Sequence, residues 1–402
     1  MTINIKKLKK GSTILFVLAP FLFPTGLQDS SRFEFLYKLL YFWRVISCAI
    51  CLIIFLRKSF FEKISKESML FFACIVSIFF STLIKNASIS SFFSTWGGFF
   101  CLYVGAEYFL QKYKYIFIDT IRKWLFVISL LNLLTMIIFP NGMFLILDKL
   151  DIIGTDSKYR WLWGFKNNLY NLILPFILFN FSASYIEKKN VFCKSNICAL
   201  MIAVCTAVLS HSSTLLLAIA LFCLILVCLK FKMVKRFVTV RNMGIIGVLL
   251  SILIVFFNIQ NLFEWLIVDI LGKDLTLSTR TILWDYAMAD IKQSLVFGYG
   301  VQNAATFGLL RYSKAFSHCH NAILTLFYQG GVLSIFTYAI FYLYTILKKY
   351  EKNNLISIFS CLLFIQLMFH ISGSISGAGF FLLLLMINNC NNIEIFERNE
   401  EC

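Results

Sequence analysis

Long apolar runs separated by short polar connections make up most of this chain. The runs reach or approach the ~20 residues that a helix needs to cross the ~30 Å hydrocarbon layer of a bilayer. The strict alternation of a membrane β-barrel is absent, so helices must satisfy the backbone hydrogen bonds. The apolar stretch from Ile197 to Leu229 is too long for one crossing, and its polar residues 210–213 predict a tight turn. The pattern predicts about twelve transmembrane helices, at residues 12–28, 35–56, 68–84, 89–110, 121–140, 167–186, 196–210, 212–229, 243–259, 320–347, 354–371 and 376–389.

Two connections are much longer than the others, and they lie at residues 141–165 and 258–319. In the second, residues 261–271 are amphipathic and are predicted to lie along the membrane surface. Ser278 is a suitable N-cap for a helix from about 279 to 292. We interpret the glycine-rich turn at residues 297–300 as a hinge and residues 1–402 as a single polytopic membrane domain.

Composition and charge agree with this class of protein and orient it. Hydrophobic residues make up 59% of the chain and charged residues only 14%. Most basic residues fall in connections that the helix order puts on one side, at residues 6–10, 57–66, 112–123, 188–194, 230–241 and 348–352. By the positive-inside rule, both termini are cytoplasmic and the two long loops are extracytoplasmic. The net charge of +17 therefore marks the cytoplasmic face, and we expect no nucleic-acid partner.

The longest loop carries the candidate chemistry. Arg280 falls in the first turn of its predicted helix, where a cation is unfavourable unless an external anion such as a phosphate binds there. A solvated or headgroup-binding arginine is the alternative. His320 and Asn321 stand at the mouth of the next membrane helix, where an imidazole can take a proton from a sugar hydroxyl. His318 competes for that role, and a structural histidine is the common alternative for either.

Other polar residues give weaker signals. No cysteine or histidine spacing matches a zinc site and no Asp-x-Asp pair is present, so we expect no metal and no cofactor. The thirteen cysteines lie mostly within helices and are interpreted as packing residues. Arg44 falls inside the second helix, with Glu107 as a possible partner. His370 lies near the outer mouth between the last two helices and is a candidate for a sugar groove.

Several of these segments together resemble one family. Residues 278–284, with Arg280 and Trp284, precede a helix and the turn at 297–300, and His320-Asn321 precedes Gly330-Gly331. The earlier loop offers Arg160, Gly164, Asn167 and Asn168. This order resembles the O-antigen polymerase (Wzy) and O-antigen ligase (WaaL) superfamily of polytopic glycosyltransferases over roughly the C-terminal two-thirds of the chain. Thr279, Val296 and Ser212-Ser213 depart from the family pattern.

The resemblance implies an all-α, GT-C-like membrane bundle that transfers a glycan from undecaprenyl pyrophosphate by metal-independent, inverting chemistry. It implies a bacterial plasma membrane location with the site facing the periplasm or cell exterior. The resemblance implies that Arg280 and His320 of this chain are catalytic. The residues expected to bind pyrophosphate or glycan are Arg160, Arg311, His318, Asn321, Trp284, Asn168 and His370.

We favour a polymerase of lipid-linked repeat units of an O-antigen or capsule, with a chain-length regulator and a flippase as possible partners. An O-antigen ligase acting on lipid A-core is the first alternative. A polysaccharide or small-molecule transporter is the second, although the chain shows no internal repeat. A non-catalytic membrane scaffold or sensor is a third, but it would not need arginines and a histidine gathered at one face.

Overall fold

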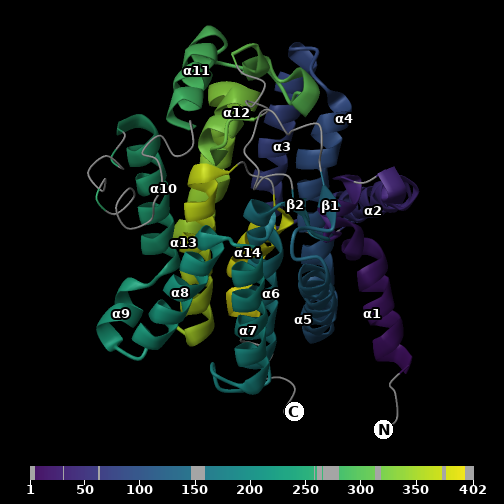
Figure 1. Cartoon of the computed structure of the whole chain (residues 1–402), viewed down its shortest axis with the longest axis vertical. Coiled ribbons are helices and arrows are strands. Elements are labelled where there is room, and N and C mark those ends of the chain that lie inside the picture. The colour runs from purple at the N-terminus through teal and green to yellow at the C-terminus, as the bar shows by residue number, and fades with distance from the viewer. Residues whose placement is uncertain are drawn as a thin grey trace.

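In the part of the chain that the structure describes, the protein is a bundle of helices with one small two-stranded sheet (Figure 1). The computed structural model describes residues 5–29, 31–61, 64–145, 159–257, 259, 265, 280–312, 318–373 and 377–393. The α-helices in this part of the chain are α1 (Ile5–Leu18), α2 (Glu34–Phe61), α3 (Lys66–Ile84), α4 (Ile89–Phe92), α5 (Gly98–Ile138), α6 (Tyr170–Ile186), α7 (Lys194–Leu209), α8 (Ser213–Cys228), α9 (Lys232–Phe237), α10 (Val240–Phe257), α11 (Arg280–Gln293), α12 (Ala322–Leu347), α13 (Asn354–Ser372) and α14 (Ala378–Asn388). Short 3₁₀ helices cover Ala19–Phe21, Thr25–Asp29, Ser31–Phe33, Lys166–Asn168, Ala304–Thr306 and Gly308–Arg311. Strands β1 (Phe144–Leu145) and β2 (Tyr159–Arg160) pair antiparallel, with Phe144 opposite Arg160.

Each predicted membrane span falls on a helix, which confirms a polytopic helical protein. Within the described residues, seven helices are long and apolar enough to cross a membrane, and three shorter apolar helices accompany them. The number of crossings stays a prediction. The first span begins earlier than predicted, at Ile5, and gives way to a 3₁₀ turn at Ala19–Phe21. Pro20 within that turn explains the early end, because proline lacks the amide hydrogen that would continue an α-helix.

Helix α5 is a hairpin of two arms rather than one long rod. A straight helix of its 41 residues would span ~60 Å, about twice the hydrocarbon layer. Lys114 has non-helical angles (φ 41°, ψ −109°), so the helix breaks there. The arms before and after Lys114 both pack against α1, since Leu18 lies beside Gly105 and Gly11 lies beside Thr120. The two spans predicted for this region match the two arms.

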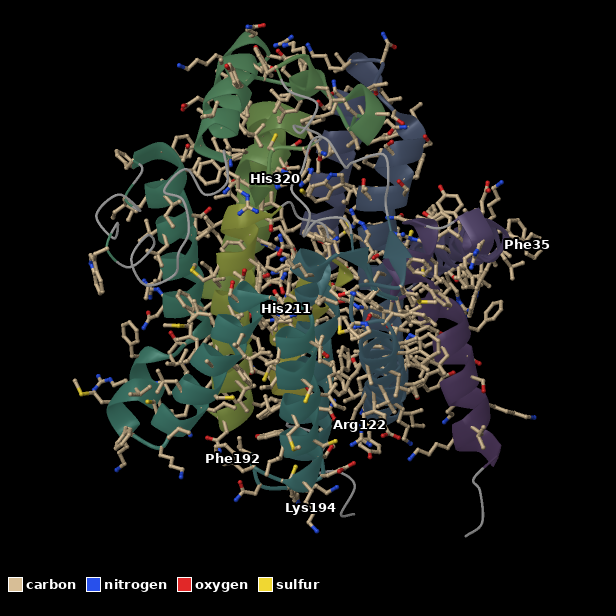
Figure 2. All side chains as sticks on the ribbon, viewed as in Figure 1. Phe35, Arg122, Phe192, Lys194, His211 and His320 are labelled. Carbon is tan, nitrogen blue, oxygen red and sulfur yellow. The ribbon has the colours of Figure 1, made fainter. Side chains whose placement is uncertain are left out.

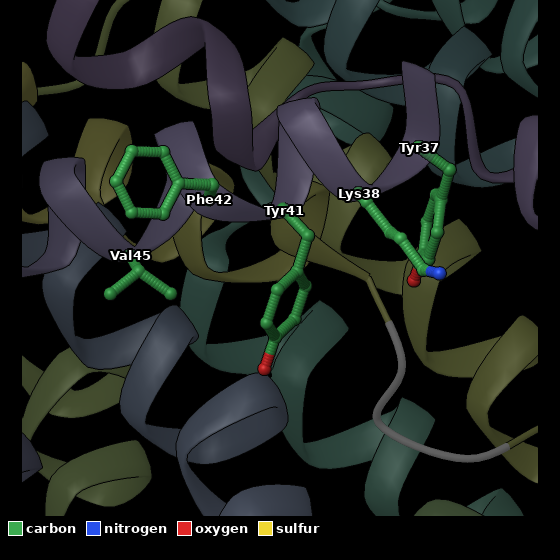
Figure 3. Close-up of a pocket in the computed structure, with 5 residues that line it drawn as sticks. All are labelled: Tyr37, Lys38, Tyr41, Phe42 and Val45. Atoms are coloured by element: carbon green, nitrogen blue, oxygen red, sulfur yellow. The ribbon is translucent and has the colours of Figure 1, made fainter. Parts of the chain in front are cut away.

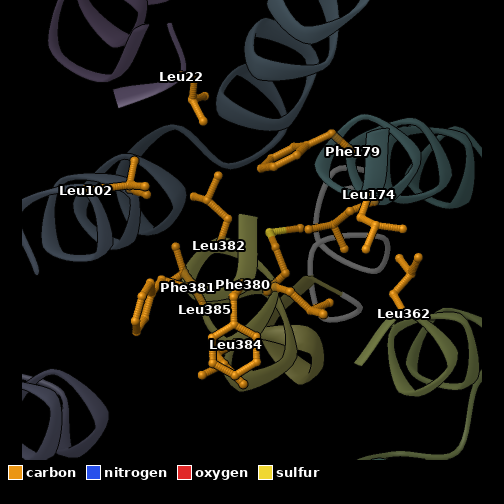
Figure 4. Close-up of a cluster of buried hydrophobic side chains, with 14 of the residues drawn as sticks. Leu22, Leu102, Leu174, Phe179, Leu362, Phe380, Phe381, Leu382, Leu384 and Leu385 are labelled. Carbon is orange, nitrogen blue, oxygen red and sulfur yellow. The ribbon is translucent and has the colours of Figure 1, made fainter. Parts of the chain in front are cut away.

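Helix α14 forms the centre of the bundle. All of its residues from Gly379 to Asn388 are buried, and a helix that is apolar on every side must be surrounded by other helices. Figure 4 shows α14 side chains among residues from its neighbours. The labelled side chains are Leu22, Leu102, Leu174, Phe179, Leu362, Phe380, Phe381, Leu382, Leu384 and Leu385.

Arg44 is held by a backbone irregularity. The Phe93–Gly97 turn between α4 and α5 is π-helical, and its Ser94 carbonyl accepts a hydrogen bond from Arg44 Nη2 at 2.9 Å. Glu107 accepts instead from the Ser68 hydroxyl at 2.7 Å, so the suggested Arg44–Glu107 pair was wrong. A π-helical turn leaves free some carbonyl oxygens that an α-helix would pair with its own amides. This explains why Arg44 donates to the Ser94 carbonyl.

The outer surface of α2 is apolar over most of its length. Phe35 is 81% exposed and Phe42 is 63% exposed. A shallow hollow on this face is lined by Tyr37, Lys38, Tyr41, Phe42 and Val45 (Figure 3). Such a face fits contact with lipid chains.

Helix α11, which belongs to the long loop between α10 and α12, lies at one end of the bundle (Figure 1). Helix α11 lies at the end opposite to the start of α1 and to α9 (Figure 1). Of the segments predicted to be cytoplasmic, the start of α1 and helix α9 therefore lie at the end opposite to α11, and the side of the membrane that each end faces stays a prediction.

Candidate functional site

The glycine-rich turn after α11 is inserted into a break in α12. Gly331 interrupts α12 with φ 61° and ψ −162°. Tyr299 N donates to Tyr328 O at 2.7 Å and Gly300 N donates to Gln329 O at 2.9 Å, while Val332 N donates to Leu295 O at 2.9 Å. The turn thus supplies partners for backbone groups that the break leaves open. Our interpretation of residues 297–300 as a hinge was wrong, because the turn is fixed in place.

Three glycines of this junction have backbone φ angles that disfavour other residues, and there is also no space for a Cβ atom. Gly298 has φ +63°, and a Cβ there would lie 2.5 Å from the Tyr328 carbonyl oxygen. Gly300 has φ +71°, and its Cβ would lie 2.6 Å from Ala87. A Cβ on Gly331 would meet the Val296 carbonyl. Any side chain at these three positions would push the turn away from α12.

The first arm of α12 is also tied to α3 and to the π-helical turn. Trp96 Nε1 donates to Gln329 Oε1 at 2.7 Å, and Ser81 Oγ donates to the Gln329 carbonyl at 3.0 Å. Val301 N donates to Thr82 Oγ1 at 3.1 Å. The start of α12 is therefore held in one position relative to the bundle.

Arg280, His318 and His320 come together at this end. The His318 and His320 rings lie with centroids 3.7 Å apart. Burial lowers the pKa of His320 to about 2, and the positive charges of His318 and Arg280 add to that effect. Burial also lowers the pKa of Arg280. His320 has a left-handed backbone (φ 48°), which is costly for a residue with a Cβ.

The Arg280 side chain is partly buried, and Arg280 is the first residue of α11, which agrees with its predicted place in the first turn of this helix. Within the described part of the chain it has no hydrogen-bond or ion-pair partner. A partly desolvated cation at the positive end of a helix dipole is unfavourable unless an anion joins it. Figure 2 shows His320 toward this end of the molecule, with Arg122 and Lys194 at the other end.

Asn321 positions α12 through both polar ends of its side-chain amide. Its Oδ1 accepts from Leu324 N at 2.9 Å as the N-cap of α12, and its Nδ2 donates to Ile371 O at 3.1 Å. His370, next to Ile371, is buried near α14, with Nε2 3.3 Å from Gln366 Nε2 and its ring against Phe380. Their substrate-binding roles stay predictions, and the geometry gives Asn321 a structural one.

Trp284 lies inside a second hydrophobic cluster. It is 2% exposed and packs with α11, α12 and the intervening segment. The members of this cluster are Leu283, Trp284, Ala287, Ile291, Phe307, Leu309, Cys319, Leu324 and Tyr328. The buried indole N–H has no hydrogen-bond partner among the residues that the structure describes. In this structure Trp284 packs α11 against α12, and its contact with substrate stays a prediction.

Arg311 is paired with a buried carboxylate that the sequence analysis missed. Asp290 is fully buried and accepts from Arg311 Nη2, from the Tyr312 hydroxyl at 3.1 Å and from the Tyr328 hydroxyl at 3.4 Å. The hydrogen bond to Tyr312 and the charge of Asp290 raise the pKa of Arg311. The only signal in the sequence was an acid on the apolar side of a short helix, which is weak by itself.

Arg160 and Asn168 come from the first outer loop. Arg160 ends β2, and its guanidinium carbon lies 5.3 Å from the centre of the Phe165 ring. Asn168 is exposed and ends the 3₁₀ turn before α6. Two residues later, Tyr170 stacks on Phe369 with centroids 4.3 Å apart. The start of α6 therefore adjoins the end of α13, beside His370.

Some predicted features fall outside the described residues. These are the N-cap Ser278, the surface segment 261–271 apart from residue 265, and most of the loop 141–165. Within the described residues, no group of three or more His, Cys, Asp or Glu side chains has the arrangement of a metal site.

A family model described as O-antigen ligase matches residues 198–339. The matched segment covers about a third of the chain and includes Arg280, Trp284, the glycine-rich turn and His320. This match supports membership of the O-antigen polymerase and ligase superfamily, whose members are membrane glycosyltransferase-like enzymes. A search of curated proteins finds no match.

Proposed function

We propose that this chain is a membrane glycosyltransferase that polymerises lipid-linked repeat units of a surface polysaccharide. The observation that carries the proposal is the partly buried Arg280, which has no partner among the described residues and stands beside the His318–His320 pair within the matched segment. A guanidinium at a helix start fits a phosphate, and the adjacent imidazole fits a sugar hydroxyl. The site would face the periplasm or cell exterior of a bacterial plasma membrane.

The proposed reaction moves a glycan from undecaprenyl pyrophosphate to an acceptor hydroxyl. The acceptor oxygen forms a bond to the anomeric carbon with inversion, and the bond from that carbon to the pyrophosphate oxygen breaks. The electron pair leaves with undecaprenyl pyrophosphate, where Arg280 stabilises the developing charge. The acceptor proton passes to His320. Arg160 is proposed as a second pyrophosphate ligand.

The low pKa of His320 fits a base that is assembled by its substrate. At neutral pH the imidazole is uncharged and has a lone pair available. Burial is the main cause of this low pKa, and the charges of His318 and Arg280 add to it. Pyrophosphate bound at Arg280 offsets the smaller, cationic contribution, so the imidazole becomes a somewhat stronger base when the donor is present. Because Arg311 is already paired with Asp290, we assign pyrophosphate binding to Arg280 and leave Arg311 out of the reacting centre.

Reconstituted protein with lipid-linked oligosaccharide tests the proposal. A ladder of longer lipid-linked glycans supports a polymerase. Label moving onto lipid A-core would show a ligase instead, and uptake into vesicles without bond formation would show a transporter. We expect full activity in a chelator, because the candidate residues are cationic or neutral; a requirement for a divalent ion would contradict the metal-independent mechanism.

A further inference from the structure

The exposed side of α11 carries an ordered aromatic stack. The rings of Tyr286 and Tyr312 lie parallel, with centroids 4.1 Å apart and an interplanar angle of 11°. The Arg311 guanidinium carbon lies 4.8 Å from the centre of the Tyr312 ring. Tyr286 is 38% exposed, Tyr312 is 40% exposed and the Arg311 side chain is 52% exposed. These three residues are called the tyrosine stack below.

The tyrosine stack is fixed from beneath by Asp290. The buried carboxylate accepts from the Tyr312 hydroxyl and from Arg311, and Arg311 Nη2 also donates to the Tyr312 hydroxyl at 3.1 Å. Exposed aromatic side chains on a surface helix usually sample several rotamers. Here the hydrogen bonds hold Tyr312 and Arg311, and the ring stacking aligns Tyr286 with them. A ligand that binds therefore has little side-chain entropy to remove.

We propose that the tyrosine stack is an accessory subsite for the glycan chain, separate from the reacting centre. Its ligand class is a neutral or acidic oligosaccharide of more than one repeat unit. The apolar C–H face of a sugar ring packs on an aromatic ring, and a guanidinium adjacent to it hydrogen-bonds sugar hydroxyls or a carboxylate. This inference rests on the proposed function, because it assigns the stack to the substrate of the same site.

Continuity with the reacting centre favours a glycan over a lipid. Arg280 begins α11 and Tyr286 follows six residues later, ~9 Å further along the helix axis. The exposed residues around the stack include Asp285, Lys292 and Gln293, which do not suit a position among lipid chains. Positions six residues apart lie about 120° apart around an α-helix, so a glycan of several sugars held at Arg280 by its pyrophosphate end must pass partly around α11 to reach the stack.

The test uses the full-length protein in nanodiscs and lipid-free oligosaccharides released from the host's own lipid-linked glycans. We expect wild-type protein to bind oligosaccharides of several repeat units more tightly than single units. Tyr286→Ala should weaken binding of the longer oligosaccharides about 2- to 10-fold, the size of one aromatic contact. Tyr286→Trp should restore it, because the ring face is kept. Polymer made by Tyr286→Ala should shift to shorter chains, with transfer to the first acceptor unchanged.

Ile282→Ala is the matched control, since Ile282 is 46% exposed on the same helix but has no ring. Equal affinities in Tyr286→Ala and Ile282→Ala would overturn the subsite. Loss of membrane insertion in Tyr286→Ala, with glycan affinity kept, would identify the stack as a lipid anchor and also overturn it. If wild-type protein makes no transfer product but binds long oligosaccharides through Tyr286, the proposed function fails and the subsite stands.

Discussion

Two polar clusters of this bundle differ in how completely their charges are partnered. The first, the Glu67 cluster, joins α3, α5, α12 and α14. Lys348 Nζ donates to Glu67 Oε1 at 2.6 Å and to Asn388 O at 3.0 Å. Asn388 Nδ2 donates to Tyr103 and Thr345, each at 3.2 Å. The second, the Arg280 cluster, consists of Arg280, His318 and His320.

The difference separates a structural network from a candidate site. In the Glu67 cluster the hydrogen bonds are made within the protein, so burial of its charges is offset. In the Arg280 cluster three groups that are cationic when protonated adjoin each other, and the described residues supply Arg280 with no carboxylate. Such an arrangement is electrostatically incomplete until an anion binds. Nearby, Arg311 shows the contrast within one loop, because Asp290 already partners it.

The largest effect is expected from His320→Ala. Loss of the imidazole that takes the acceptor proton should lower kcat about 10²- to 10⁴-fold. His318→Ala should cost less, because His318 acts on His320 rather than on the acceptor. Both are measured by glycan extension with reconstituted protein. A greater loss in His318→Ala would assign the base to the other imidazole.

Arg280→Ala should follow, with a loss of about 10²- to 10³-fold in transfer. Arg280→Lys should rescue poorly, because an ammonium cannot make the two parallel hydrogen bonds of a guanidinium. Arg236→Ala, on the exposed α9, is the matched control and should retain activity. If Arg280→Ala transferred glycan at the wild-type rate, the Arg280 cluster would not be the reacting site, and the difference between the two clusters would have no functional meaning.

Lys348→Met should lower stability and leave activity per folded molecule unchanged. The change strands the Glu67 carboxylate, and because the Lys348 side chain is 32% exposed we expect about 1–3 kcal/mol of destabilisation. Thermal unfolding in detergent, with transfer assayed below the transition, measures both quantities. A selective loss of transfer without loss of stability would show that the Glu67 cluster serves the reaction.

The smallest effect concerns pH. The pKa of His320 is about 2 in the free protein, where burial is the main cause, so His320 is already uncharged from pH 8 down to pH 5. We therefore expect kcat/KM, which reports groups of the free enzyme, to show no acid limb from His320 near pH 6.5. An acid limb near pH 6.5 that disappears in His320→Ala would show that the imidazole is more solvated than the structure indicates.

Much of the fold followed from the chain alone. Hydrophobic runs long enough to cross a bilayer predicted the helices, including the two arms of α5, because in lipid only helices satisfy the backbone within such a run. The polar turn at residues 210–213 also lies between α7 and α8, as predicted. The first helix was misplaced by several residues, since hydropathy does not register where a charged helix end continues beyond the apolar core.

The candidate site was predicted less completely. The position of Arg280 at a helix start was correct, because capping and dipole effects are local. Trp284 and Asn321 were grouped with substrate ligands, whereas the structure buries one in a cluster and uses both polar ends of the other internally. Asp290 was missed because its partners are 21 to 38 residues away along the chain.

The sequence by itself determined a helical membrane protein, its charge asymmetry and the residue types available for chemistry, because hydropathy, charge and helix-end preferences act over a few neighbouring residues. Only the tertiary structure decided which cations are partnered, that the glycine-rich turn fills the break in α12, and that Tyr286 stacks on Tyr312. These arrangements depend on backbone groups and side chains brought together from distant segments, and no local pattern encodes their distances.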